Sequence, residues 1–238
     1  MTVTTIQSVS DFHETFGRHS SDYVIYRGVK NENYELIPSI GRYGAQKKQR
    51  EKMERELFEQ FKRSATAHLK TPPSNNDWEW LVLAQHYRLP TRLLDWTTNP
   101  LVAAFFAVSD PNDSEANSNC AIYSFTNPTR HSFYSATEPP PPGTTWGSPL
   151  RATGTGAFEP PHLSPRIAAQ GAVLTMQDPD VPLNLNEIGK CLIPNELRSQ
   201  LESMLNRYGV NTATMFPGPE GTANHLRRLI ETDSLAIP

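Results

Sequence analysis

The order of strand-like and helix-like segments along this 238-residue chain predicts an α+β fold. Short apolar segments typical of buried strands recur along it, at 23–28, 121–125, 167–176 and 187–193. Amphipathic or capped segments predict helices at 51–69, 78–87, 100–108, 195–207 and 219–231. These segments interleave without the regular alternation of a parallel βαβ sheet, so we favour α+β.

Two of the helices have clear sequence signals. Within 51–69, apolar side chains recur at four-residue spacing and charges occupy the other face, as in Leu57, Phe61, Ala65 and Leu69. For the helix at 100–108, Asn99 can act as the N-terminal cap and Pro100 suits the first helical position. The apolar side chains that follow predict a helix that packs into the core.

Composition predicts one globular domain over 1–238, with a long proline-rich surface insertion at about 127–165. The net charge of −3 implies no bulk attraction to nucleic acid or to an anionic membrane. Cys120 and Cys191 lack metal-ligand spacing, and no apolar run is long enough to cross a bilayer. We therefore expect a cytoplasmic protein with reduced thiols, no metal site and no membrane segment.

The densest group of polar side chains directly precedes the apolar helix at 100–108. Polar groups beside a core segment cost stability unless they bind a ligand or one another. Asp95 could pair with Arg92 or with Arg27, while Thr97 and Thr98 could cap the helix or contact a ligand. Trp96, in the same segment, is either a core residue or a surface on which a ring stacks.

Three further positions are candidates for chemistry. Arg27 ends an apolar strand and could bind a phosphate or carboxylate with two hydrogen bonds, or close the strand with an ion pair. Gly28 after it would let backbone approach a ligand. His86 could carry a proton or cap helix carbonyls. Gln170 lies on a segment predicted to be a strand, where a polar side chain needs a partner.

Several familiar motifs are missing from the sequence. It has no GxGxxG, no phosphate-binding P-loop, no HExxH and no GxSxG. Their absence argues weakly against kinases, P-loop NTPases, zinc hydrolases and α/β-hydrolases.

Taken together, these segments resemble the FRG domain, which is named for a Phe-Arg-Gly motif. The motif stands here as Tyr26-Arg27-Gly28, and the resemblance continues through the strongest segment, QHYRLPTRLLDWTTNP at 85–100. It resumes at Pro165-Arg166-Ile167 and Gln170-Gly171, with a weaker trace at 215–217. The resemblance covers most of residues 20–230, apart from the proline-rich stretch.

The FRG resemblance implies an ADP-ribosyltransferase-like fold, a split antiparallel sheet with a cleft for NAD. By that resemblance Arg27 holds NAD, and a Ser/Thr-containing strand supplies Thr97 and Thr98 to the nicotinamide pocket. The residue that steadies the ribose falls on or near Gln170. This position departs from the ADP-ribosyltransferase layout, which has a glutamate there, so Glu159 and Glu187 are the alternative carboxylates. Further contacts to NAD are expected from Tyr26, Gly28, Tyr87, Arg92 and Asp95.

The function implied is NAD-dependent ADP-ribosyl transfer, as a toxin effector in anti-phage defence or a toxin–antitoxin system. A carboxylate stabilises the positively charged transition state of such a transfer better than an amide does. His86 could instead deprotonate the acceptor. The acceptor is RNA or protein, with RNA favoured because a basic run follows Lys47 (47–63). A protein antitoxin would be a further partner. The alternatives are a non-catalytic FRG module that senses a ligand, and an NAD glycohydrolase.

Overall fold

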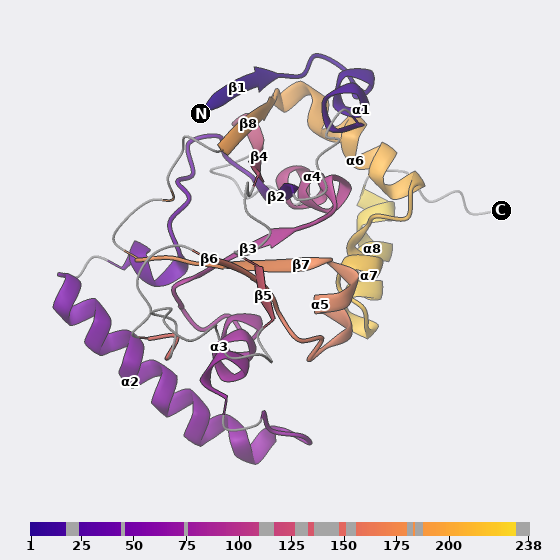
Figure 1. Cartoon of the computed structure of the whole chain (residues 1–238). Helices are drawn as coiled ribbons and strands as arrows, with labels where there is room; N and C mark the ends of the chain where they lie inside the picture. The colour runs from indigo at the N-terminus through magenta and orange to yellow at the C-terminus, as the bar shows by residue number, and fades with distance from the viewer. Residues whose placement is uncertain are drawn as a thin grey trace.

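The computed structural model describes residues 1–17, 24–43, 46–73, 76–109, 117–126, 133–135, 148–150, 156–179, 183 and 188–231. Its strands form one eight-stranded sheet in the order β1-β8-β4-β2-β3-β7-β6-β5 (Figure 1). The strands are β1 Thr2–Thr5, β2 Val24–Val29, β3 Leu93–Thr97, β4 Cys120–Thr126, β5 Phe133–Ser135, β6 Gly156–Glu159, β7 Ala172–Met176 and β8 Ile188–Ile193. The helices are α1 Val9–Gly17, α2 Lys47–Ala65, α3 Asp77–His86, α4 Pro100–Val108, α5 Pro165–Ala169, α6 Arg198–Arg207, α7 Thr212–Met215 and α8 Pro219–Glu231. Short 3₁₀ helices are η1 Ser39–Arg42, η2 Thr66–His68 and η5 Asn195–Leu197.

The predicted α+β class is confirmed, but the sheet is mixed rather than antiparallel throughout. Its inner pairs are antiparallel, whereas β1 pairs with β8 and β5 pairs with β6 in parallel. The pairing between β2 and β3 consists of the single register pair Tyr26 and Thr97. By contrast, β2 pairs with β4 along six positions and β3 pairs with β7 along five. The sheet is therefore two ladders that meet at one narrow junction.

Most of the helix predictions agree with the structure. Asn99 Oδ1 accepts a hydrogen bond from the Leu101 amide at 2.9 Å, and Pro100 takes the first helical position of α4, so this cap is confirmed. Helix α2 begins at Lys47, four residues earlier than its apolar pattern indicated. Helix α6 ends before Gly209, whose φ of +76° suits glycine.

The prediction of one strand at 167–176 is wrong in its first half. Ser164 and Pro165 start the short helix α5, and Gly171, with φ of +51°, ends it before β7 begins. Gln170 therefore lies in the turn between α5 and β7. The predicted insertion at 127–165 contains β6, which pairs with β7 and buries Phe158, so this part belongs to the sheet. Residues 127–132, 136–147 and 151–155 of that insertion lie outside the described residues.

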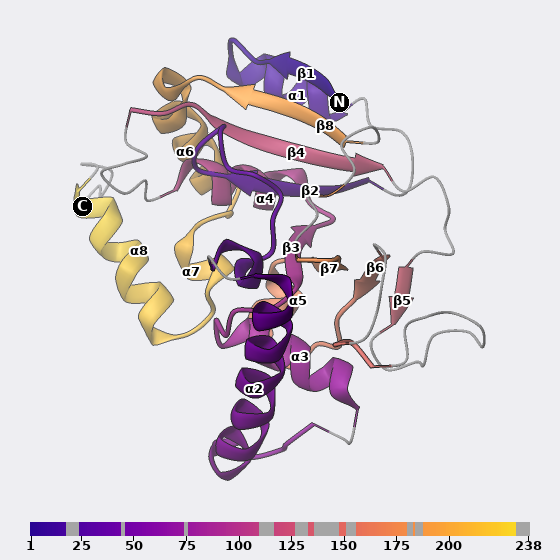
Figure 2. The same cartoon turned by 90° about the vertical axis from the view of Figure 1, so that its left-hand side faces the viewer.

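Apolar side chains pack in three clusters around the two ladders. Helices α1, α4, α6 and α7 pack against one face of β4 and β8, around Phe12 and Ile122 (Figure 2). Helices α2, α3 and α5 pack against β3, β6 and β7, around Phe58 and Phe158. A third cluster joins both ladders, from Ile25 on β2 to Trp96 on β3. Among the described residues, no helix is long and apolar enough to cross a membrane.

Candidate functional site

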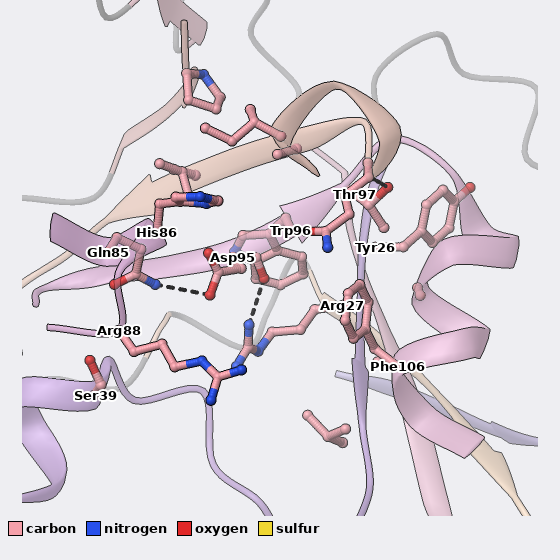
Figure 3. Close-up of a pocket in the computed structure, with 18 of the residues that line it drawn as sticks. Tyr26, Arg27, Ser39, Gln85, His86, Arg88, Asp95, Trp96, Thr97 and Phe106 are labelled. Carbon is pink, nitrogen blue, oxygen red and sulfur yellow. Dashed lines mark hydrogen bonds between the residues drawn. The ribbon is translucent and has the colours of Figure 1, made fainter. Parts of the chain in front are cut away.

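A cavity of about 480 Å³ lies where β2 and β3 diverge (Figure 3). Its walls come from both ladders, with β2 and α4 on one side and α3, β3 and α5 on the other. The 3₁₀ helix η1 also contributes Ser39 and Arg42. A volume of this size is within the range of small-molecule sites in proteins.

Cationic side chains outnumber acidic ones in the walls of this cavity. Two carboxylates, Glu35 and Asp95, also line it. The cationic residues outnumber them and are Arg27, Lys30, Arg42, Arg88 and Arg166. The cavity thus holds an excess of three positive charges in a chain whose formal net charge is −3. Such a concentration of like charge favours an anionic ligand.

Arg27 extends from β2 into the gap between the ladders. Its Nη1 donates a hydrogen bond to the main-chain oxygen of Asp95 at 2.6 Å, and its buried Nε has no partner within the described structure. Burial lowers the pKa of the Arg27 guanidinium, the Asp95 carboxylate opposes this, and repulsion from Arg42 adds to the lowering. A buried donor without a partner is costly, which favours a ligand that accepts from it.

Arg88 reaches the same space from the opposite wall. It follows the end of α3 with a φ of 65°, a left-handed conformation in which glycine is usual and other residues are strained. The Leu89 amide donates to the Ala84 carbonyl at 2.9 Å, which closes the helix around this residue. The guanidinium groups of Arg88 and Arg27 point toward each other (Figure 3).

The electrostatic environment of the site reflects mutual repulsion among cations. Burial lowers the pKa of Arg166, and the nearby Arg88 lowers it further. Burial also lowers the pKa of His86, with a second contribution from Arg166 that Asp95 partly offsets. The imidazole of His86 is therefore neutral at pH 7 and can accept a proton. The Arg166 guanidinium stacks 4.6 Å above the centre of the Phe216 ring.

Hydrogen bonds hold Asp95 against α3 rather than against an arginine. Gln85 Nε2 donates to Asp95 Oδ2 at 2.9 Å, and Gln85 Oε1 accepts from the Thr91 hydroxyl at 2.5 Å. Asp95 follows the alternation of β3, so it shares a face with Leu93 and opens into the cavity.

Several of the residues predicted from the sequence border this cavity. They come from distant segments and are Tyr26, Arg27, Gly28, His86, Asp95, Thr97 and Gln170. Thr97 uses its hydroxyl to donate to the Gln170 carbonyl at 2.7 Å and to accept from the Asn99 amide at 3.0 Å. Gln170 Nε2 donates to the Met215 carbonyl at 2.9 Å, so this amide ties α5 to α7.

Other predicted residues lie elsewhere. Arg92 is buried and forms a two-point ion pair with Glu54, with distances of 3.0 Å for Nε–Oε1 and 2.6 Å for Nη2–Oε2. The expected pairing of Asp95 with Arg92 is therefore wrong. Tyr87 is 59% exposed and packs beside Phe61, outside the cavity wall.

Thr98 and the alternative carboxylates are also absent from the cavity wall. The Thr98 amide donates to the Gly171 carbonyl at 3.0 Å, which extends the β3–β7 ladder. Glu159 is exposed at the end of β6 and does not line the cavity. Glu187 lies outside the described residues.

Two residues of the Tyr-Arg-Gly motif have structural contacts. A Cβ on Gly28 would lie 1.9 Å from the Ala103 carbonyl oxygen, so glycine here allows α4 to pack on β2. The close approach that this glycine allows is thus to a helix. The Tyr26 ring is 4% exposed and packs edge-on against Phe16, away from the arginines (Figure 3).

Several cations of the basic run on α2 are paired or buried. Lys47 pairs with Asp178, Lys62 pairs with Asp77, and Arg50 is buried with a hydrogen bond to the Tyr43 carbonyl. Lys52 also approaches Glu56. Lys48, Arg55 and Arg63, on the same helix, are exposed.

The cavity residues that were not predicted as site residues include Arg42, Arg88 and Phe106. Arg42 and Arg88 resemble ordinary surface cations in the sequence, and Phe106 lies within an apolar helix pattern. The one local signal is an arginine at the helix end in QHYRLP, where glycine would be usual. The backbone strain at Arg88 becomes visible only in the structure.

Part of the chain is similar to a known protein family. The profile of the FRG domain family matches residues 22–116, whereas no curated protein and no solved structure matches the chain. The matched region runs from β2 through α4 and supplies Arg27, Arg42, Arg88 and Asp95 to the cavity, while Arg166 and Gln170 come from beyond it. The match therefore assigns residues 22–116 to the FRG domain family.

Proposed function

We propose that this protein binds NAD in the arginine-lined cavity and transfers its ADP-ribose to a macromolecule. The observation that carries the proposal is the pair Arg27 and Arg88, whose guanidinium groups point toward each other from opposite walls (Figure 3). Neither forms an ion pair within the described residues, so a pyrophosphate between them would relieve their repulsion. Guanidinium groups bind phosphate oxygens in this two-point manner.

The remaining walls suit the other parts of a dinucleotide. Phe106 is half-buried and lines the cavity, so it can stack on a nicotinamide or adenine ring. This role replaces the stacking expected of Tyr87 or Trp96. The Trp96 indole is fixed in the core by a hydrogen bond from Nε1 to Thr175 Oγ1 at 2.9 Å.

The proposed reaction consists of one bond cleavage, one bond formation and one proton transfer. The bond between nicotinamide and C1 of the ribose breaks, and its electron pair leaves with neutral nicotinamide. A lone pair of the acceptor forms the new bond at C1, and the proton of the acceptor passes to a base. His86 suits that last role, because burial and Arg166 lower its pKa and keep its imidazole unprotonated at neutral pH.

The acceptor and the biological setting rest on the resemblance to the family. We propose RNA or protein as the acceptor and a role as a toxin effector in anti-phage defence or a toxin–antitoxin system. Such a toxin would need a neutralising protein partner and would act in the cytoplasm. The free, buried Cys120 and Cys191 are compatible with a reducing compartment.

A second candidate is a ligand-sensing module without turnover. It is favoured by Gln170, which stands where the ADP-ribosyltransferase layout has a glutamate and whose Nε2 is held by the Met215 carbonyl. An NAD glycohydrolase is the third candidate, in which water takes the place of the acceptor.

Labelled NAD distinguishes these candidates. Pure protein is incubated with NAD labelled in its adenylate part, with and without cell extract, and nicotinamide release and macromolecular label are followed. Release with label transferred supports ADP-ribosyl transfer, and release without label supports hydrolysis. Binding without release supports the sensing module, and the absence of both binding and release contradicts the proposal.

Arg27→Met tests the cavity itself, because it keeps the unbranched aliphatic part of the side chain and removes the charged guanidinium. We expect at least a hundredfold loss of nicotinamide release, with unfolding in urea changed by about 1 kcal/mol or less. Arg227→Met is the matched control, since Arg227 is exposed on α8, and it should retain full activity. Wild-type turnover in Arg27→Met would remove Arg27 from the site.

A further inference from the structure

The carboxylate of Asp95 is not used to bind Arg27. The guanidinium donates to the main-chain oxygen of Asp95, and the side chain bonds instead to the neutral amide of Gln85. Within the described part of the chain, Asp95 forms no ion pair, although Arg27, His86 and Arg166 all sense its charge. Its negative charge therefore remains available to the cavity.

A chain of hydrogen bonds fixes the direction of this carboxylate. The Leu93 amide donates to Thr91 Oγ1 at 3.1 Å, so the hydroxyl proton is free to be donated to Gln85 Oε1. That bond determines which end of the Gln85 amide faces Asp95, because the oxygen is occupied and the NH₂ group must point to Oδ2. Ser39 holds Thr91 in turn, since its hydroxyl accepts from the Thr91 amide at 3.0 Å.

These hydrogen bonds fix the orientation of the Asp95 carboxylate through Oδ2 and, among the described residues, leave its Oδ1 unbonded. Gln85 occupies Oδ2, and no described residue donates to Oδ1. Asp95 lies on a strand, next to the Arg27 bond and on the wall that also carries His86. Both carboxylates of the cavity are exposed, but Glu35 lies outside any helix or strand. A group held on a strand by a hydrogen-bonded neighbour is oriented more accurately than one on a loop.

We propose that Asp95 is the catalytic carboxylate of the transfer reaction and that Gln85 and Thr91 are its positioning residues. This inference rests on the proposed function. As the bond from nicotinamide to C1 breaks and its electron pair leaves with nicotinamide, the ribose carbon gains positive charge. Asp95 Oδ1 stabilises that charge until the acceptor lone pair forms the new bond and the acceptor proton passes to His86.

Asp95→Asn tests the assignment, because it removes the charge and keeps both the size and the ability to accept from Gln85. We expect kcat for nicotinamide release to fall by about 10²–10³-fold. The affinity for ADP-ribose, measured by calorimetry, should stay equal or become tighter, because an anion is removed from a site that binds an anion. Asp178→Asn is the matched control, since Asp178 pairs with Lys47 away from the cavity and the variant should retain wild-type kcat.

The positioning residues are tested by Gln85→Leu and Thr91→Val. Each should lower kcat about tenfold while KM changes less than twofold. In a protein that already carries Asp95→Asn, adding Gln85→Leu should not lower kcat further. A merely structural role would instead alter KM and stability together, and additive effects in the double variant would exclude Gln85 as a positioning residue.

The outcomes separate this inference from the function on which it rests. If the wild type releases nicotinamide and Asp95→Asn does so at a similar rate, the assignment of Asp95 is overturned while the proposed function stands. If Asp95→Asn loses ADP-ribose binding in proportion to turnover, Asp95 is a ligand-binding or structural residue and the assignment is again overturned. If the wild type binds ADP-ribose but never releases nicotinamide, the proposed function itself fails.

Discussion

Arg27 and Arg92 illustrate two uses of an arginine beside the same sheet, since Arg92 is buried and Arg27 is half-buried. Arg92 precedes β3 and meets both oxygens of Glu54, which also accepts from the Arg92 amide at 3.1 Å. Arg27 lies on β2 with one bond to a carbonyl and a buried Nε that no described residue satisfies. The partnered arginine supports the fold, while the other leaves charge for a ligand. Burial alone therefore does not identify a binding arginine, and its partners must be known.

The largest expected effect comes from breaking the Arg92 pair. Glu54→Ala leaves a buried guanidinium without its counter-charge, so the free energy of unfolding should fall by about 3–5 kcal/mol in urea denaturation. Glu56→Ala is the control on the same helix, because its pair with Lys52 is exposed and should contribute less than about 1 kcal/mol. Equal losses in the two variants would contradict the distinction between the two arginines.

A smaller effect is expected beside Arg27, at Gly28. In Gly28→Ala the new methyl group meets the backbone oxygen of Ala103, which cannot move without shifting α4, and we expect a loss of about 1–3 kcal/mol. Gly189→Ala is the comparison, since its Cβ would meet the Ser124 hydroxyl at 2.6 Å and that side chain can rotate. A Gly28→Ala protein as stable as wild type would mean that the motif glycine serves the ligand rather than the packing.

The smallest effect concerns the titration of His86. Its pKa is lowered by burial and then by Arg166, so the unfolded chain binds the proton more readily than the folded one. Stability from this group is complete above the ordinary histidine pKa of about 6.5 and is lost as the pH falls through the lower folded pKa. NMR titration should place the His86 pKa below 6.5, and Arg166→Met should raise it. An unchanged pKa in that variant would show that Arg166 does not contribute to the cationic field.

The sequence predicted local structure well where a single signal was strong. The Asn99–Pro100 cap and the apolar run before Arg27 gave α4 and β2, because each depends on adjacent residues. The segment 167–176 was assigned wrongly because its apolar residues fit a strand, while Ser164, Pro165 and Gly171 divide it into a helix and a strand. Strand β1 and helix α1 were not predicted, since their patterns are short.

The candidate site was predicted in part for a similar reason. Motif residues such as Arg27, Asp95 and Gln170 could be named from the sequence, and they line one cavity. Their partners could not, because Glu54 lies 38 positions before Arg92 and nothing in the sequence distinguishes it from neighbouring glutamates. The same limit applies to Arg88, whose importance depends on a backbone conformation.

Because β2 and β3 share a single register pair, Arg27 also helps to connect these two strands. Beyond Tyr26 and Thr97 the strands separate, and the guanidinium meets the Asp95 carbonyl across the opening. The Arg27 side chain thus supplies a hydrogen bond between β2 and β3 where their backbones form none. An anion that draws this guanidinium toward itself would compete with that carbonyl for Nη1, so a bound ligand and the contact between β2 and β3 would share one donor.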